Sequence, residues 1–323
     1  MKRLALSLGL AALICATLPA LSQAGTMYNF QTVNFPGDTF TQLLGINNSS
    51  TIAGYHGATI NVGFTLTLPN HYALENFPNA TSTQVIGINN TGMTDGFYVD
   101  TAGVTHGFTY NGTTFSSVNA PNTAFNQLLG INDHGEVSGY SSTDPTGATL
   151  QMAYTEMGGN FTYLSSLLPG GIGNNQATDV NNAGMISGFF LTDNGADSTG
   201  FVLNGNALTQ LEFPGSSFTQ ALGLNNKGEV VGFYVDANGN THGFTYVNGV
   251  YTEVNDPNAV NNTTINGVND LGQLVGFYTV GNITSGFVAS TTPEPASLFL
   301  FGAGLLGFGF MLRRRKVAAA HLQ

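Results

Sequence analysis

The chain has 323 residues, of which 8% are charged, and a formal net charge of −11. Six of its seven Lys and Arg residues lie near the two ends, so residues 25–292 carry Lys227 alone against 17 of the 18 Asp and Glu residues. A body with this charge balance repels phosphate backbones and anionic lipid, which excludes nucleic acid as an expected partner.

Residues 1–24 are typical of a secretory signal peptide. A basic start precedes an apolar run, Leu4–Leu18, and Ser22-Gln23-Ala24 supplies the small residues of a cleavage site. The run is shorter than the roughly 20 residues that span a membrane. The single cysteine, Cys15, lies inside this run, so the exported body has no thiol for a disulfide or a metal site.

Residues 25–292 contain six copies of one unit. Shifted by 136 residues, Gly87–Tyr110 matches Gly223–Tyr246 at 16 of 24 positions. Each copy has an Asn, then a Gly seven residues later, then an aromatic residue. The Asn positions are Asn47, Asn89, Asn132, Asn181, Asn225 and Asn269, and the Gly positions are Gly54, Gly96, Gly139, Gly188, Gly232 and Gly276. Such a period indicates a repeat architecture.

Each unit is predicted to hold four short strands, called a to d. Strands a and b flank a turn such as Asn226-Lys227-Gly228, and their residues are β-branched or aromatic. Strands c and d, Thr241–Tyr246 and Val250–Val254, flank Asn248-Gly249, the pair that type I′ hairpin turns favour. Four strands in roughly 40–50 residues are typical of one propeller blade.

The two ends of the repeat region complement each other. Tyr28–Phe35 resembles a strand d but precedes the first unit, while the last unit stops after its strand c. We therefore predict an all-β fold, a six-bladed β-propeller of four-stranded blades closed by the N-terminal strand, because closure removes exposed sheet edges. An open β-solenoid is the alternative.

Residues 293–323 form a separate tail. Pro293, Glu294 and Pro295 precede an apolar segment, Leu298–Leu312, predicted to be a short transmembrane helix, and then a basic cluster of Arg313, Arg314, Arg315 and Lys316. This order resembles the PEP-CTERM sorting signal of Gram-negative bacteria. The resemblance implies processing by an exosortase, transient inner-membrane association through 298–312, and release to the cell surface or the exopolysaccharide matrix. An ordinary tail anchor is the alternative.

The repeats themselves resemble a second family. Thr105-His106-Gly107-Phe108 and Thr241-His242-Gly243-Phe244 are similar to the motif of extracellular HAF-type (His-Ala-Phe) repeats. That resemblance implies secretion and a β repeat, and it assigns no activity.

The sequence predicts no catalytic constellation and no metal site. The histidines lack the His-x-x-His and His-Glu-x-x-His spacings, and no Gly-x-Ser-x-Gly occurs. His106 and His242 are interpreted as strand residues beside turns. The oxygen-rich loops 193–197 and 236–240 lack the Glu of an EF-hand, which favours turn formation over calcium, the one cofactor left open.

Two features are candidate ligand-facing sites. At the start of strand a, five units have a Gln and the sixth has Thr264; if strand a is innermost, these amides approach the central channel. There they either bond one another, the favoured interpretation, or hold a neutral polar ligand such as a sugar. Asp95 stands where sister units have Ala, Ser or Val and is a candidate cleft residue. The amides are Gln42, Gln84, Gln127, Gln176 and Gln220.

These features predict an exported, exosortase-processed protein of the cell surface or exopolysaccharide matrix with a non-catalytic structural or binding role. The alternative is a propeller that binds or processes extracellular glycan. The fold alone cannot choose between the two functions.

Overall fold

The computed structural model describes residues 27–169, 173–192 and 195–292, and this part of the chain contains 24 β-strands and no α-helix. The strands of the first three units are β2 (Thr41–Ile46), β3 (Thr51–His56), β4 (Val62–Thr67) and β5 (His71–Leu74); β6 (Ser82–Ile88), β7 (Thr94–Val99), β8 (Thr105–Tyr110) and β9 (Phe115–Val118); and β10 (Phe125–Ile131), β11 (Val137–Ser142), β12 (Met152–Met157) and β13 (Asn160–Tyr163).

The strands of the remaining units follow the same order. They are β14 (Asn175–Val180), β15 (Met185–Thr192), β16 (Asp197–Asn204) and β17 (Ala207–Leu211); β18 (Phe218–Leu224), β19 (Val230–Val235), β20 (Thr241–Val247) and β21 (Val250–Glu253); and β22 (Thr263–Val268), β23 (Leu274–Val280) and β24 (Ile283–Thr291). The remaining strand, β1 (Tyr28–Val33), precedes all of them.

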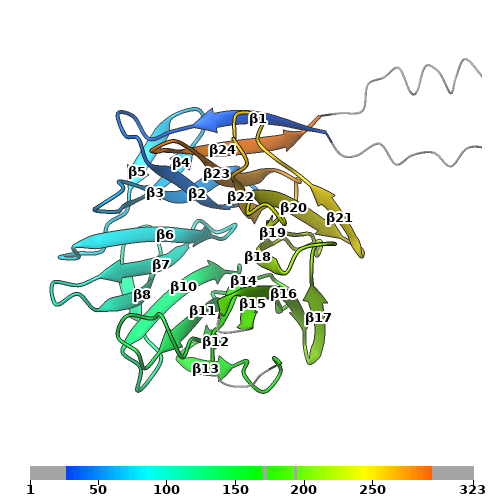
Figure 1. The fold of residues 1–323 in the computed structure, drawn as a ribbon. Helices are drawn as coiled ribbons and strands as arrows, with labels where there is room; N and C mark the ends of the chain where they lie inside the picture. Colours follow the sequence, from blue (N-terminus) through cyan, green and yellow to red (C-terminus); the bar gives the residue numbers. More distant parts are fainter. Residues whose placement is uncertain (1–26, 170–172, 193–194, 293–323) are drawn as a thin grey trace, which may run out of the picture.

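Within each unit the strands pair antiparallel with their neighbours in the chain, giving four-stranded sheets. The fourth and fifth units are counted as one eight-stranded sheet because a single parallel pair, Ser198 with Phe218, joins β16 to β18. Figure 1 shows the sheets side by side around a common centre, with the first strand of each unit innermost. This arrangement is that of a β-propeller.

The N-terminal strand completes the sheet of the last unit. β1 pairs antiparallel with β24, from Tyr28 opposite Thr291 to Val33 opposite Gly286, and the sheet order is β1-β24-β23-β22. The predicted pairing of the chain's first strand with its last unit is thus present (Figure 1), whereas an open solenoid would leave the two ends apart. β1 ends two residues before Phe35, whose N–H donates to Thr41 Oγ1 in the next strand instead.

The core lies between neighbouring sheets. Strand c of each unit places one aromatic ring there, and all six rings are fully buried; burial of such a side chain contributes roughly 1.5–3 kcal/mol. Phe108, for example, packs with Ala53 of the preceding unit, and Phe287 packs with Val231. The six rings are Phe64, Phe108, Tyr154, Phe201, Phe244 and Phe287.

The repeated Gly after each turn is explained by a close backbone approach. Strand a carries a β-bulge opposite it, for example between Leu43 and Gly45 in β2. A Cβ on Gly54 would lie 2.3 Å from the carbonyl oxygen of Gln42, and a Cβ on Gly232 would lie 1.9 Å from that of Gln220. Any side chain at these positions would therefore push strands a and b apart.

The predicted membrane segments cannot be compared with this fold. Within the described residues, no helix combines the length and the apolar character needed to cross a bilayer. The predicted signal peptide, 1–24, and the apolar segment 298–312 lie outside them.

Candidate functional site: the central channel

A cavity of about 440 Å³ lies at the centre of the molecule. Its walls are strand a of every unit, namely β2, β6, β10, β14, β18 and β22, together with the turns that follow these strands. The middle of the wall is mostly aliphatic, with Leu44, Ile86, Leu129 and Leu222. Polar groups lie at both ends, which differ in construction.

The turn end of the channel is encircled by a ring of hydrogen bonds between the six repeated Asn residues. Each Nδ2 donates to the backbone carbonyl of the corresponding Asn in the next unit, at 2.9–3.1 Å, and the sixth unit donates back to the first. In chain order the ring is Asn47, Asn89, Asn132, Asn181, Asn225, Asn269 and again Asn47.

The same Asn side chains also fix their own turns. Asn89 Oδ1 accepts the backbone N–H groups of Thr91 and Met93, both at 3.0 Å, and every other unit repeats this pair of bonds. One amide thus satisfies two backbone donors of its own turn and one acceptor of the next unit. The sequence predicted the turn; the bond between units had no local signature.

A second ring lies directly beside the first. The backbone N–H of the residue after each Asn donates to the side-chain oxygen of its counterpart in the next unit, at 2.7–2.9 Å. Its members are Asn48, Asn90, Asp133, Asn182, Asn226 and Asp270. The two rings together tie all six turns into one closed network.

The two carboxylates of this second ring lie three units apart. Asp133 Oδ2 accepts the side-chain amides of Asn90 and Asn182, at 2.9 and 2.6 Å. Asp270 Oδ2 accepts those of Asn48 and Asn226, at 2.7 and 3.0 Å.

These bonds decide the charge of the turn end. Partial burial raises the pKa of Asp133, but the hydrogen bonds from Asn90 and Asn182 outweigh it and hold the pKa below its usual range. The pKa of Asp270 is lowered in the same way, by Asn226 and Asn48 against burial. The turn end therefore carries two negative charges at neutral pH.

At the opposite end, the Gln residues differ from one another. Gln42, Gln176 and Gln220 line the cavity with Thr264, next to the rings of Phe189, Phe233 and Phe277, whereas Gln84 and Gln127 are not among its lining residues.

The expected bonds among these amides are replaced by bonds to other groups. Tyr55 Oη donates to Gln42 Oε1 at 2.6 Å, Gln84 Nε2 donates to Asn61 Oδ1 at 2.7 Å, and Gln176 Nε2 donates to Gln151 Oε1 at 3.0 Å. Asn61 and Gln151 belong to loops between strands b and c of the preceding unit. Because those loops reach over the start of the next strand a, they supply nearer partners than the other amides do.

Asp95 does not line this cavity. It lies in β7 and is fully buried, and its Oδ1 accepts the N–H of Gly87 at 2.8 Å. Burial raises its pKa to about 8. A second carboxyl, Asp179, is not among the residues selected from the sequence; it lines the cavity where all five sister units have Gly, and burial raises its pKa to about 7.

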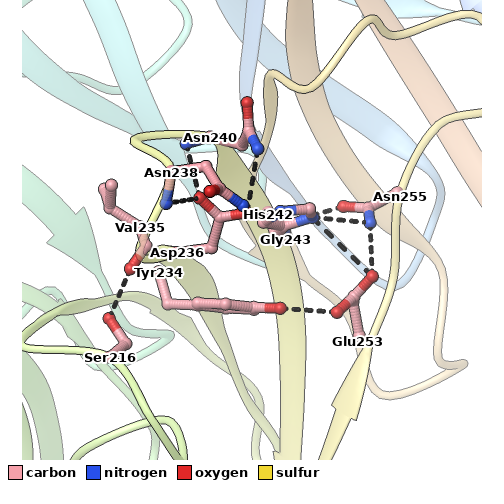
Figure 2. A network of polar contacts seen from close by, with 10 residues as sticks. All are labelled: Ser216, Tyr234, Val235, Asp236, Asn238, Asn240, His242, Gly243, Glu253 and Asn255. Atoms are coloured by element: carbon pink, nitrogen blue, oxygen red, sulfur yellow. Dashed lines mark hydrogen bonds and ion pairs between the residues drawn. The ribbon is translucent and has the colours of Figure 1, made fainter.

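His242 lies in β20, beside the turn formed by residues 236–240 (Figure 2). Asp236 Oδ1 accepts the N–H groups of Asn238 and Asn240, both at 2.8 Å, and Asp236 Oδ2 lies 3.4 Å from His242 Nε2. His242 Nδ1 faces Asn255 at 3.0 Å, so both ring nitrogens have partners.

The second unit repeats this arrangement. His106 lies 3.2 Å from Asp100 and 3.3 Å from Asn119. Across the described ranges, no group of three or more His, Cys, Asp or Glu side chains is placed to hold a metal ion. Part of the loop 193–197 and all the predicted sorting residues, Pro293, Glu294, Pro295, Arg313, Arg314 and Arg315, lie outside those ranges.

Comparison with known proteins identifies the tail. Residues 291–316 match the family model described as the PEP-CTERM protein-sorting motif. This signal implies exosortase-dependent export across the membrane, with the protein ending on the cell surface or outside the cell. No curated protein matches the chain.

Solved structures resemble the body at low identity. Putative TolB from Agrobacterium tumefaciens has a TM-score of 0.52 at 12% identity, covering 71% of this chain and 88% of that one. The fucose-specific lectin from Aleuria aurantia has a TM-score of 0.48 at 9% identity, covering 79% and 97%. The β-propeller domain of the trilobed protease from Pyrococcus furiosus has a TM-score of 0.44 at 11% identity, covering 77% and 95%. At such identities a likeness concerns the fold alone.

Proposed function

We propose that this protein is an exported, exosortase-processed component of the cell surface or exopolysaccharide matrix, with a non-catalytic binding role. Its parts are a signal peptide at 1–24, a body at 25–292 and a sorting segment at 293–323. The body is a six-bladed β-propeller in which the eight-stranded sheet counts as two blades and β1 closes the ring. Six repeated units and the pairing of β1 with β24 support this count. The HAF-type character of the repeats belongs to the same proposal.

The observation that carries the binding role is the composition of the central cavity. Gln42, Gln176 and Gln220 and three Phe residues line it where strands a begin. Amides donate and accept hydrogen bonds without charge, and aromatic faces cover apolar surface, so together they suit a neutral, hydroxyl-rich ligand. The ligand class we propose is therefore a neutral segment of extracellular polysaccharide, held at this end of the channel.

Charge supports a neutral ligand over an anionic one. Asp133 and Asp270 place two negative charges at the turn end, and Lys227 is the only Lys or Arg in residues 25–292. An anionic polymer or a nucleic acid would be repelled.

A glycan array, followed by titration calorimetry with the host's exopolysaccharide, tests this role. We expect binding by the exported protein and at least tenfold weaker binding by the double variant Gln42→Ala/Gln220→Ala. Asn111→Ala is the matched control, since Asn111 lies in an exposed turn between β8 and β9. Equal binding by all three proteins would remove the channel from the proposal.

A second candidate, glycan processing, rests on Asp179. A cavity carboxyl whose pKa is raised to about 7 has the protonation behaviour of a general acid. Turnover of the host polysaccharide that is lost in Asp179→Asn would favour processing, whereas binding without turnover favours the non-catalytic role.

The sorting proposal is tested separately. Expressed in a host with an exosortase, the protein should pass transiently through the inner membrane by 298–312 and then lose 298–323. Mass spectrometry of the exported material measures this directly. Exported protein that still contains 299–311 would contradict the processing step.

A further inference from the structure

The third unit differs from the others at both of its interfaces. The residue of strand b that precedes the repeated Gly is Ala53, Val231 or Val275 in the first, fifth and sixth units, but Asp95, Ser138 and Ser187 in the second, third and fourth. Strand c contributes a Phe to the core in five units and Tyr154 in the third. The polar substitutions are thus concentrated on consecutive units.

Asp95 and Tyr154 occupy matching positions across one interface. In the interface before it, Ala53 of the first unit packs with Phe108 of the second. By the same repeat relation, Asp95 of the second unit lies at the place that faces Tyr154 of the third. The two side chains also interact electrostatically: burial, then Tyr163, Glu156 and Asp95, raise the pKa of the Tyr154 phenol.

Three buried polar atoms in this region have no partner. Asp95 Oδ2, Tyr154 Oη and Ser138 Oγ make no hydrogen bond within the described part of the chain, and all three residues are fully buried. Buried polar groups are nearly always bonded, to protein or to ordered water. Bound water that bridges the carboxyl and the two hydroxyls would satisfy them.

Gly130 connects the two interfaces of the third unit. A Cβ on Gly130 would lie 2.6 Å from Asp179 Oδ1 and 3.0 Å from Ser138 Oγ, and the Gly130 backbone offsets part of the rise in the pKa of Asp95. Asp179 in turn accepts the N–H groups of Val180 and Leu224, at 2.8 and 2.9 Å. Asp179 therefore lies against the glycine whose backbone also acts on Asp95.

The electrostatics of the two carboxyls agree with this geometry. Burial raises the pKa of Asp95 to about 8, N–H donation from Gly87 offsets part of this rise, and the charge of Asp179 adds to it. The other titratable groups that act on this contact are Tyr154 and, through it, Glu156 and Tyr163. At neutral pH the Asp95 carboxyl holds its proton.

We propose that the interface between the second and third units is a pH-sensitive contact of the ring, in which protonated Asp95 and Tyr154 hold the two units together and loss of the proton loosens them. This contact lies in the wall of the channel, not among its ligand-facing amides, so it stands whether or not a glycan binds.

The sign of the pH dependence follows from the direction of the pKa changes. Both carboxyls titrate at higher pH in the folded chain than in the unfolded chain, where the pKa is near 4. Their contribution to stability is complete below about pH 4 and disappears as the pH rises through the folded values, near 7 and 8. Over that range each carboxyl lowers the folding equilibrium constant by up to about tenfold per pH unit.

The chain supplies its own matched control. The double variant Asp95→Ala/Tyr154→Phe recreates the Ala53–Phe108 pair of the preceding interface. Folding equilibrium constants of the exported protein, measured by denaturant unfolding at pH 6 and pH 9, should fall at least tenfold further in the wild-type protein than in this variant. Equal pH dependence in the two proteins would overturn the proposal.

Infrared spectroscopy keeps the test valid if the double variant does not fold. At pH 6.5 the wild-type protein should show the C=O stretch of protonated carboxyls, which should disappear by pH 9.5 and be weaker in Asp95→Asn, where only the band of Asp179 remains. A wild-type protein without this band would overturn the proposal. A band of unchanged strength in Asp95→Asn that is lost in Asp179→Asn would overturn the assignment of a proton to Asp95.

Discussion

The two ends of the central channel are built on opposite plans. At the turn end, six equivalent Asn residues make the same three hydrogen bonds in every unit, and the bonds close on themselves. At the other end, equivalent Gln residues have different partners, and only some of them line the cavity. Identity between repeats therefore marks the residues that hold the units together, whereas variation between repeats marks the end where a ligand could be recognised.

Two features could keep the molecule closed: the N-terminal strand and the rings of hydrogen bonds at the turn end. Deletion of 25–36 removes β1, including the buried Val33 and the half-buried Phe30, whose ring centroid lies 5.3 Å from that of Phe287. We expect a loss of more than about 5 kcal/mol in the free energy of unfolding, measured by denaturant titration. Deletion of 25–26, which spares β1, is the control, and similar stability of both truncated proteins would contradict closure by the strand.

The role of the ring can be separated from the role of the turn. Asn89→Ala removes three turn bonds, from the Thr91 N–H, the Thr91 hydroxyl and the Met93 N–H, and also the bond to Asn132, so it should cost about 2–4 kcal/mol. Asn111→Ala removes comparable turn bonds in an exposed hairpin that has no ring bond, and it should cost about 0.5–1.5 kcal/mol. Equal losses in chemical denaturation would mean that the ring contributes nothing beyond its turns.

Substitutions of the Gln residues at the start of strand a should change stability by unequal amounts. Gln84→Leu leaves Asn61 without one partner and should cost about 1–2 kcal/mol. Gln220→Leu should change stability by less than about 0.5 kcal/mol, because its side chain bonds no other described residue. Thermal unfolding of both variants measures the difference, and equal losses would show that the two amides are structurally equivalent after all.

The smallest expected effect is on the stability of the fold at low pH. The pKa of Asp133 is lower in the folded chain than its ordinary value, so its contribution to stability is present above about pH 4 and is lost as the pH falls through the folded pKa. Asp133→Asn should therefore flatten the acid limb of the stability profile, by less than about 1 kcal/mol because solvent screens the group. An unchanged acid limb would show that the carboxylate is interchangeable with the Asn residues beside it.

Much of this fold follows from local sequence. The period of the repeats, the Asn-Gly turns and the missing last strand predicted four-stranded units and the pairing of the chain's ends, because turn chemistry and strand alternation act over a few residues. The repeated Gly could also be read as a backbone constraint, although its cause, the bulge opposite Gly54, appears only in the pairing of strands a and b.

The site was less accessible to sequence reasoning. The invariant Asn was assigned to a turn, and its bond to the next unit was missed because that bond spans more than 40 residues and depends on how sheets stack. Asp95 was noticed as an exception to the repeat, but burial was not foreseen, since an acidic residue is rarely buried. Asp179 was overlooked although it replaces a Gly of the repeat, which was the signal that could have found it.

The ring of Asn hydrogen bonds does not depend on where the chain begins. Each amide points to the next unit in chain order, and Asn269 points to Asn47 as if no ends existed. The two ends of the described body meet where the Thr292 N–H donates to the carbonyl of Met27 at 2.8 Å, so a short linker between these two residues could join them. New ends placed at the exposed turn residue Gly215, between the fourth and fifth units, would leave every bond of the ring in place. The order of the units round the axis is thus independent of the order in which they are synthesised, and a circularly permuted chain should reach the same structure.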